Sequence, residues 1–292
     1  MKENINTNVL EHTFTNDALF KILFTRNPCL LKKLVAAMLG IDSNSIKRLK
    51  VINSEISAEL LTGKFVRLDI NMDIDGQRVN LEIQVKKGPL RERSLYYWAR
   101  NFSTALKKKG KYDTLPRTIS LNILEEPIFE CGEYYSEFLL LETTRNELLT
   151  DKLLLKYYEL EKVPDIIDVN NPLERWLKLF GAKTEDELII IERMGVPEMS
   201  DAIKDYRDIV VSEEFNELQR LREKAEHDEA QAIADAVADA VEQEKKNTAR
   251  KLKQAKIEIV RNLLTINIPI NQIVKATGLS QEEVKKLASF DS

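Results

Sequence analysis

The sequence predicts an α/β protein with a long helical C-terminal extension, and three observations support this prediction. Residues 65–85 alternate polar and apolar positions on both sides of Asp75-Gly76, which is typical of two half-buried strands joined by a two-residue turn. Residues 18–38 instead place apolar side chains at helical spacing. Residues 213–265 contain neither glycine nor proline and are rich in strong helix formers, so we expect one long helix or two nearly continuous ones.

Two helices are expected near the N-terminus. The first begins at Thr15-Asn16-Asp17, because these residue types favour helix starts, and Pro28 breaks its pattern. Gly40 ends the second helix. Cys29 lies in the apolar stretch, and we interpret it as a small core residue.

The remaining elements follow from apolar runs and from glycine and proline positions. Pro89 begins a helix that continues to about Lys109 and stops at Gly110. The others are, in chain order, a strand at 48–56 before the hairpin, strands at 117–124, 134–143 and 152–160, and helices at 173–180 and 185–194.

The hairpin determines which side chains face each other. If its loop holds only Asp75-Gly76, one face pairs apolar residues throughout, and the other face sets Asp69 opposite Glu82. Like charges directly opposite in a sheet are destabilising. A divalent cation between the carboxylates is one explanation, and two carboxylates that simply point into water are the other. Gln84 follows Glu82 on the same face, where its amide can hold a water or a phosphate oxygen.

Composition narrows the possible chemistry. The chain has 292 residues, of which 32% are charged, and a net charge of −4. No apolar run approaches the roughly 20 residues that cross a bilayer, so we expect a soluble protein without a membrane partner. An N-terminus without an apolar export signal and two cysteines fit the cytoplasm. His12 and His227 lack ligand spacing, which disfavours zinc. A catalytic metal would then have oxygen ligands, as Mg²⁺ or Mn²⁺ does, and no small-molecule organic cofactor is indicated.

The basic residues are unevenly distributed. Residues 86–111, directly after the hairpin, carry nine Lys or Arg and one acid. A basic stripe beside two carboxylates suits a phosphodiester substrate. Within the expected helix, Arg93, Tyr97 and Arg100 share one face, and we expect Arg93 to contact a phosphate with Tyr97 packed or hydrogen-bonded nearby. The alternative is a surface helix whose Tyr97 and Trp98 belong to the core.

The C-terminal helices carry two further patterns. Ile233, Val237 and Val241 form an apolar stripe, but no strict heptad is sustained, so a coiled coil and a solvated helix with a narrow packed stripe are both open. Pro269 begins a second helix, and Ser280 begins a third with a capping-box glutamate. Such a helix-turn-helix pattern fits either a DNA-binding tail or a packing and self-association module.

Taken together, these residues resemble a known family. The residues in question are Asp17-Ala18-Leu19-Phe20-Lys21 in the first helix, Leu68-Asp69-Ile70 and Glu82-Ile83-Gln84 in the strands, and Arg93, Tyr96, Tyr97, Gly110 and Tyr112. They are similar to the Rpn group of bacterial recombination-promoting nucleases, the PD-(D/E)XK nuclease family transposases. The specific motifs span 17–112, and a looser likeness extends through 152–163 and the Thr277-Gly278-Leu279-Ser280 tail.

The resemblance implies a restriction-endonuclease-like core, in which a mixed central sheet is flanked by helices in the order αβββαβ. It also implies that Asp69 and Glu82 ligate magnesium, with the Ile83 carbonyl completing the shell. Gln84 stands where the wider superfamily usually has lysine, and a glutamine can orient water or phosphate but cannot transfer a proton. Asp17 corresponds to an acidic residue that assists the metal from the first helix.

These inferences predict a magnesium-dependent DNA endonuclease that promotes recombination or is transposase-related, with DNA as substrate and a homodimer as the working form. The alternative is a catalytically inactive DNA-binding or assembly protein on a nuclease fold, and a purely structural helical oligomer makes poor use of the charged hairpin. We expect four parts, namely a nuclease core at 1–165, a helical extension at 166–211, a charged, alanine-rich helix at 212–250 suited to oligomerisation, and a small helical tail at 251–292.

Overall fold

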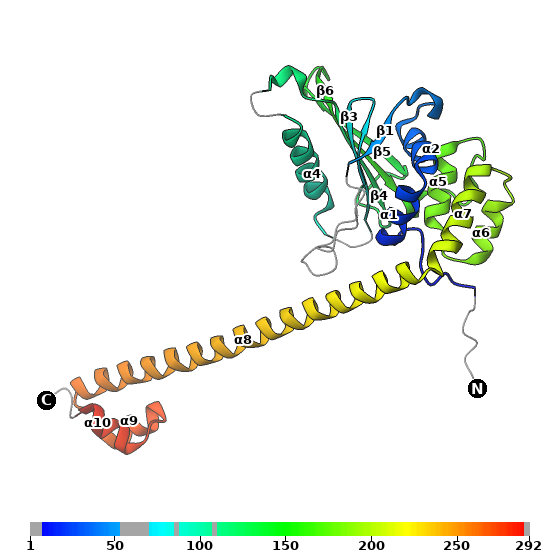
Figure 1. Ribbon diagram of the computed structural model, residues 1–292. Helices are drawn as coiled ribbons and strands as arrows, with labels where there is room; N and C mark the ends of the chain where they lie inside the picture. The colour runs from blue at the N-terminus through cyan, green and yellow to red at the C-terminus, as the bar shows by residue number, and fades with distance from the viewer. Residues whose placement is uncertain (1–7, 53–69, 85–87, 107–109, 289–292) are drawn as a thin grey trace, which may run out of the picture. The chain divides into compact units, whose positions relative to one another are not determined.

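The computed structural model describes residues 8–52, 70–84, 88–106 and 110–288 (Figure 1). The chain divides into two compact units, one ending at Glu223 and one beginning at Lys224. The finer division into four parts stays a prediction.

A six-stranded mixed sheet forms the centre of the first unit. Its strand order is β1-β2-β3-β4-β6-β5. The pairs β1–β2, β2–β3 and β5–β6 are antiparallel, whereas β3–β4 and β4–β6 are parallel. The strands are β1 (Leu49–Val51), β2 (Ile70–Ile74), β3 (Gln77–Gln84), β4 (Thr118–Leu124), β5 (Tyr135–Leu141) and β6 (Leu148–Glu159).

Helices cover both faces of this sheet. Figure 1 shows α4 on one side and α1, α2, α5, α6 and α7 on the other. The helices are α1 (Asp17–Arg26), α2 (Pro28–Leu39), α4 (Leu90–Thr104), α5 (Pro172–Gly181), α6 (Glu185–Glu192) and α7 (Pro197–Val210), with short 3₁₀ turns η1 (Ser43–Ser45), η2 (Tyr112–Thr114) and η3 (Leu160–Lys162). A mixed sheet flanked by helices confirms the predicted fold class.

The hairpin has the predicted register over its described residues. Asp75 and Gly76 form the turn with φ of 50° and 86°, the left-handed pair that a tight hairpin requires. Ile70 pairs with Leu81 and Met72 pairs with Val79, and these apolar side chains are all buried against the main core.

The main core lies between the sheet and the helices of its α1 side. Its largest side chains are aromatic and include Phe20, Phe24, Trp176 and Phe180. A smaller apolar cluster on the α4 side contains Leu90, Leu124, Leu155 and Tyr157. Because each face of the sheet has its own covering layer, the central strand β3 is shielded from solvent on both sides.

The second unit contains most of one long helix and two short ones. The helix α8 (Glu213–Thr265) is continuous, as its composition predicts, and is followed by α9 (Ile270–Thr277) and α10 (Gln281–Ala288). Val260, Ile273 and Val284 form the small core of this tail. Ser280 and Glu283 make the predicted reciprocal capping contacts at the start of α10.

Two sequence predictions are corrected by the structure, and one helix was not predicted. Cys29 is exposed rather than buried, because it lies in the first turn of α2, ahead of the residues that face the core. The helix after Pro89 ends at Thr104 and not near 109, where the Ser103 and Thr104 hydroxyls bond back to helix carbonyls and compete with helix continuation. The helix α7 was missed within the predicted extension.

The described helices also bear on membrane insertion. None of them is both long enough and apolar enough to span a bilayer.

Candidate functional site

The site begins with Glu82 in the middle of β3. Its side chain is only 3% exposed, so the interpretation that this carboxylate points into water is wrong. The helix α4 packs against β3 and β4 on the face that Glu82 shares with Asn80 and Gln84. Burial of an acidic side chain is costly unless polar groups surround it.

Two amides of the same strand hold the Glu82 carboxylate. Asn80 Nδ2 donates to Glu82 Oε1 at 3.0 Å, and Gln84 Nε2 donates to Oε2 at 2.5 Å. The three residues alternate along β3, so their side chains lie in one row on one face. The alternation that sequence analysis found therefore positions the carboxylate and fixes its orientation.

A helix residue extends this row. Arg93 Nη2 of α4 donates to Gln84 Oε1 at 2.7 Å, so Gln84 links the guanidinium to the Glu82 carboxylate. A lysine at position 84 would set two cations side by side here. The departure from the superfamily pattern is thus matched by Arg93, which supplies positive charge from the helix.

Two buried polar atoms in this row have no hydrogen-bond partner among the described residues. They are Asn80 Oδ1 and Arg93 Nε. A buried polar group without a partner is destabilising, and such groups are rare in native proteins. The carbonyl oxygen suits a hard cation or its bound water, and the N–H suits an anionic oxygen. These two atoms therefore fit a site that holds a divalent cation together with a phosphate.

The predicted metal ligands can be placed only in part. Asp69 lies outside the described residues. Ile83 is half-buried and packs its side chain against the main core. Within the described part of the chain, no group of three or more His, Cys, Asp or Glu residues gathers as a metal cluster. The assignment of Asp69, Glu82 and Ile83 as ligands stays a prediction.

Asp17 has a defined partner in α8. Its carboxylate accepts hydrogen bonds from both terminal guanidinium nitrogens of Arg222, with Nη2 and Oδ2 2.9 Å apart. The two side chains are 29% and 19% exposed. This contact ties the start of α1 to α8, and it is independent of the predicted assistance to a metal, which stays a prediction.

The three residues predicted to share one face of α4 differ in their contacts and exposure. Arg93 joins the Glu82 row, Arg100 is exposed, and Tyr97 is half-buried. Trp98 donates its indole N–H to the Thr118 carbonyl at 2.8 Å, so it fastens α4 to β4. The described contacts thus bring only Arg93 of this trio to the carboxylate.

Several residues around the site were missed by sequence reasoning. Asn101 of α4 donates to Asn71 of β2 at 3.0 Å, and both line a small cleft between α4 and the hairpin. Tyr157 of β6 is hydrogen-bonded to Ser94, and its pKa is raised by burial and also by the Glu82 charge. Asn101 lies eight residues after Arg93, close to the same helix face, which is the one signal that could have identified it.

Lys21 belongs to the motif quoted from the first helix, but no role of its own was predicted for it from the sequence. It is 2% exposed and belongs to α1, which contacts β3. Lysine is almost never fully buried unless it is paired. Its spacing of one turn from Asp17 in an otherwise apolar helix could have marked it as a buried polar position.

The comparison with known proteins agrees with this architecture. The fold and site define an α/β protein with a buried carboxylate in a central strand of a mixed sheet. Residues 14–236 match the PD-(D/E)XK nuclease family transposases. Because this match covers well over half of the 292 residues, the chain belongs to that family. No curated protein and no solved structure matches the chain.

Family membership confirms the resemblance inferred from the motifs. The protein is nuclease- and transposase-related, and DNA is the substrate that a nuclease family implies. Proteins of this kind generally use divalent metal ions.

Proposed function

We propose that this protein is a magnesium-dependent DNA endonuclease that hydrolyses phosphodiester bonds in recombination, with manganese as a possible substitute. The observation that carries the proposal is the buried Glu82, held in one orientation by two strand amides beside a half-buried arginine. Burial of an acid in a sheet lowers the stability of the fold, so a residue with a purely structural role would not need to be an acid here. Family membership supports the same conclusion.

The cation would be held by Asp69, Glu82 and the Ile83 carbonyl. When bound, it would activate a water and neutralise charge on the scissile phosphate. Asn80 and Gln84 keep the Glu82 carboxylate aimed, and Gln84 orients water or phosphate without transferring a proton, because an amide does not titrate.

Arg93 is suited to hold the substrate phosphate. Its Nη2 is engaged by Gln84, while its buried Nε has no partner among the described residues. Guanidinium groups bind phosphate oxygens through several N–H groups at once. Arg100, which is exposed two turns further along α4, extends this positive charge, and contacts of this kind strengthen DNA binding without reading sequence.

Plasmid cleavage tests the proposal. Supercoiled plasmid is incubated with the full chain and Mg²⁺, with and without EDTA, and nicked and linear products are measured. We expect metal-dependent cleavage that falls at least about 100-fold in Asp69→Ala and in Glu82→Ala. Glu92→Ala, an exposed acid on α4, is the matched control and should retain activity. Circular dichroism of each variant separates lost chemistry from lost folding.

The other outcomes are equally informative. Cleavage that survives both carboxylate substitutions would contradict the assigned site. DNA binding without any cleavage by the folded wild type would favour the inactive DNA-binding or assembly protein instead.

Asp17 can be tested in the same assay. If Asp17 assists the metal, Asp17→Asn should lower cleavage well below that of Arg222→Gln, which breaks the same ion pair but leaves the acid in place. Equal losses would assign Asp17 a purely structural role.

A further inference from the structure

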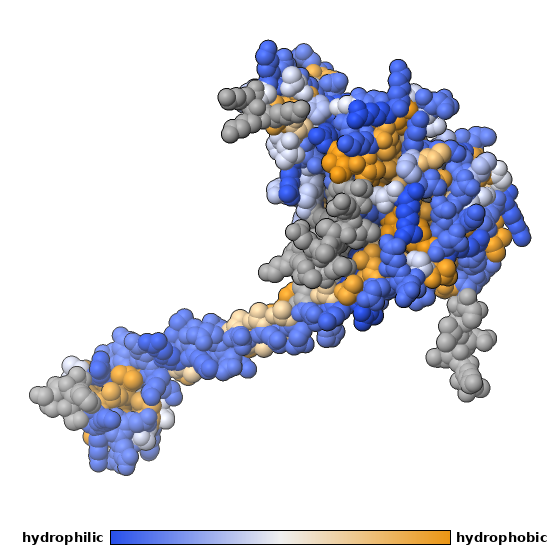
Figure 2. All heavy atoms as spheres, viewed as in Figure 1, coloured by the Kyte–Doolittle hydropathy of each residue, from blue (hydrophilic) through white to orange (hydrophobic). Residues whose placement is uncertain are grey.

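The long helix α8 exposes a row of large apolar side chains. Within the second unit, Ile233, Val237, Val241, Leu252 and Ile259 are 59%, 58%, 49%, 60% and 49% exposed. Figure 2 shows paler, more apolar residues along α8 among strongly hydrophilic ones. None of the five belongs to the small tail core around Val260. A solvated helix of this length would more commonly carry polar residues all round.

Four of the five residues fit an 11-residue spacing rather than a heptad. Val241 and Leu252 are 11 residues apart, and Val237 and Ile259 lie 11 residues on either side of Thr248. An 11-residue repeat has 3.67 residues per turn, close to the 3.6 of a straight helix. The apolar row therefore runs almost straight along α8, which explains why no heptad is sustained.

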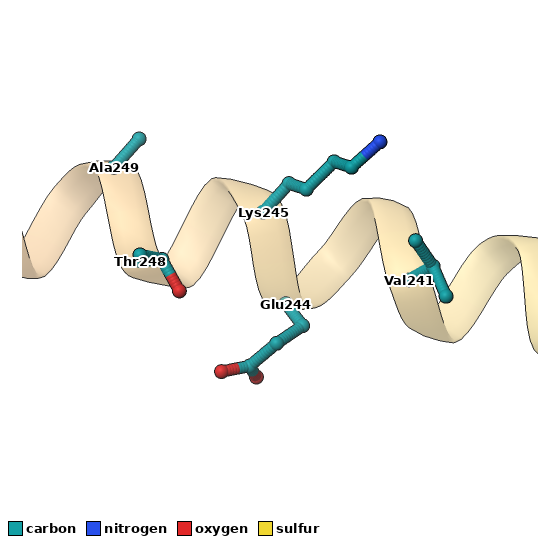
Figure 3. A pocket seen from close by; sticks show the side chains of 5 residues that line it. All are labelled: Val241, Glu244, Lys245, Thr248 and Ala249. Atoms are coloured by element: carbon teal, nitrogen blue, oxygen red, sulfur yellow. The ribbon is translucent and has the colours of Figure 1, made fainter.

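The centre of this row is a shallow surface between two charged side chains. Figure 3 shows Val241 on one turn and the neighbouring Thr248 and Ala249 two turns further along, with Glu244 and Lys245 on the turn between them extending to opposite sides of the helix. Small side chains flanked by charges allow a second helix to approach closely, with the charges at the rim of the contact.

The charge distribution along α8 is also polarised. Residues 224–244 carry seven acids and one lysine, and residues 245–261 carry seven Lys or Arg and one glutamate. Two copies paired in parallel would set acidic half against acidic half. Two copies paired antiparallel would set each acidic half against a basic half, which is the favourable arrangement.

We propose that α8 pairs with α8 of a second copy of this chain in an antiparallel dimer, with the two-fold axis near residue 246. In this register Val241 meets Leu252, Ile233 meets Ile259, and Val237 meets Ala255 of the other copy. Each apolar side chain of the row thereby gains an apolar partner. An antiparallel pair with a two-fold axis is closed, so the assembly stops at two copies.

The rim of the interface is complementary in the same register. Glu242 lies on the same side of the row as Lys253, and Glu244 lies on the same side as Lys251. In the stated register, each acid of one copy stands within two or three residues of the corresponding lysine of the other. The Glu242–Lys246 ion pair along the helix (2.6 Å) leaves the apolar row uncovered. This interface uses none of the residues placed in the Glu82 site, so its failure and the failure of the nuclease proposal are distinguishable.

The first experiment measures the oligomeric state of the full chain by sedimentation velocity over a range of concentrations. We expect a species of twice the monomer mass. The double variant Val241→Asn with Leu252→Asn should weaken the dimer by about tenfold or more, because both central contacts are lost. Gln243→Asn with Gln254→Asn is the matched control, since it introduces the same residue at the same spacing on the opposite face.

The controls make each outcome decisive. The helical signal in circular dichroism should be the same in both double variants, because the substituted positions are exposed in one chain. A monomeric wild type, or a dimer unaffected by the Val241 and Leu252 substitutions, would overturn the proposal.

The second experiment determines the orientation. Both natural cysteines are exposed, so Cys29→Ser and Cys131→Ser are combined with Gln231→Cys, and a spin label is attached. An antiparallel dimer centred near residue 246 places the two labels about 45 Å apart along the axis. A parallel pair would bring them within about 20 Å, and this short distance would overturn the proposed orientation.

Discussion

The two units of this protein use charge and apolar surface in opposite ways. In the first unit, Glu82 and Lys21 are buried within the fold, and the aromatic side chains of the main core, such as Trp176 and Phe180, are fully enclosed. In the second unit, charges lie along the surface of α8 and the apolar side chains of its central part stay exposed. The first unit therefore encloses its main core within a single chain, whereas the central part of α8 presents its apolar side chains to solvent.

The difference lies in the range of the contacts. In the first unit, side chains meet across the sheet, and Arg222 meets Asp17 although they are 205 residues apart in the chain. In the second unit, the hydrogen bonds and ion pairs described along the central part of α8 join residues of that helix, such as Gln231 and Asp235. Substitutions should therefore have large effects on folding in the first unit and small ones along α8.

The largest expected effect comes from the aromatic core. Trp176 is 1% exposed and packs against Phe24 and Phe180. Trp176→Ala should lower the free energy of unfolding of the first unit by about 3–5 kcal/mol. Val237→Ala, on the exposed row of α8, should change it by less than about 0.5 kcal/mol. Urea denaturation followed by circular dichroism measures both, and equal losses would show that the two regions do not differ as described.

An intermediate loss of stability is expected for substitutions of Gln84 and Arg93 beside Glu82. Gln84→Lys places a second cation beside Arg93, and Arg93→Gln removes the donor to Gln84, so each should cost about 1–3 kcal/mol of stability. In the double variant the new lysine faces Glu82 without a competing cation. The combined loss should therefore be smaller than the sum of the single losses by about 1 kcal/mol or more.

A double-mutant cycle on an exposed ion pair of α8 provides the comparison for the coupling between Gln84 and Arg93. Substituting Glu242 and Lys246 singly and together should give a coupling energy of only about 0.3–0.5 kcal/mol, because the pair is exposed. Strictly additive losses for Gln84 and Arg93 would contradict the proposed link between strand and helix.

A smaller effect on the stability of the first unit concerns its dependence on pH. Burial of Glu198 would raise its pKa, but its backbone hydrogen bond and the charges of Lys33 and Arg175 outweigh this and hold the pKa below its ordinary value. Arg175 Nη2 lies 2.9 Å and Lys33 Nζ 3.4 Å from the carboxylate. An acid with a lowered folded-state pKa stabilises the fold above its unfolded pKa, about 4.3 for glutamate, and this contribution is lost as the pH falls through the lowered value.

Glu198→Gln should therefore cost about 1 kcal/mol at pH 7 and make the loss of stability below about pH 4 less steep. Thermal unfolding measured from pH 7 to pH 3 gives both quantities. Glu258→Gln, an exposed position on α8, should leave the unfolding of the first unit unchanged over the same range. An unaltered slope in Glu198→Gln would rule out this linkage.

Local chemistry allowed much of the fold to be predicted. Asn16 and Pro28 mark helix starts, Gly40 ends α2 with a φ of 71°, and Asp75-Gly76 sets the hairpin register. These features depend on backbone preferences within a few residues. The position of Glu82 on one strand face follows from the same register, which is why the sequence could single it out.

The side chains that surround Glu82 could not be predicted from local sequence preferences. The bond from Arg93 to Gln84 depends on how α4 lies across β3, and the burial of Lys21 depends on how α1 meets the sheet. Cys29 is an example of the opposite error. Its neighbours in the sequence are apolar, but its side chain lies on the exposed side of α2.

The sequence by itself determined most of the helices, the turn and the register, because each is decided by neighbouring residues or by a fixed periodicity. Only the tertiary structure decided which polar groups are buried and which partners they meet. Burial and long-range pairing depend on the packing of elements that are far apart in the chain, and no local pattern contains that information.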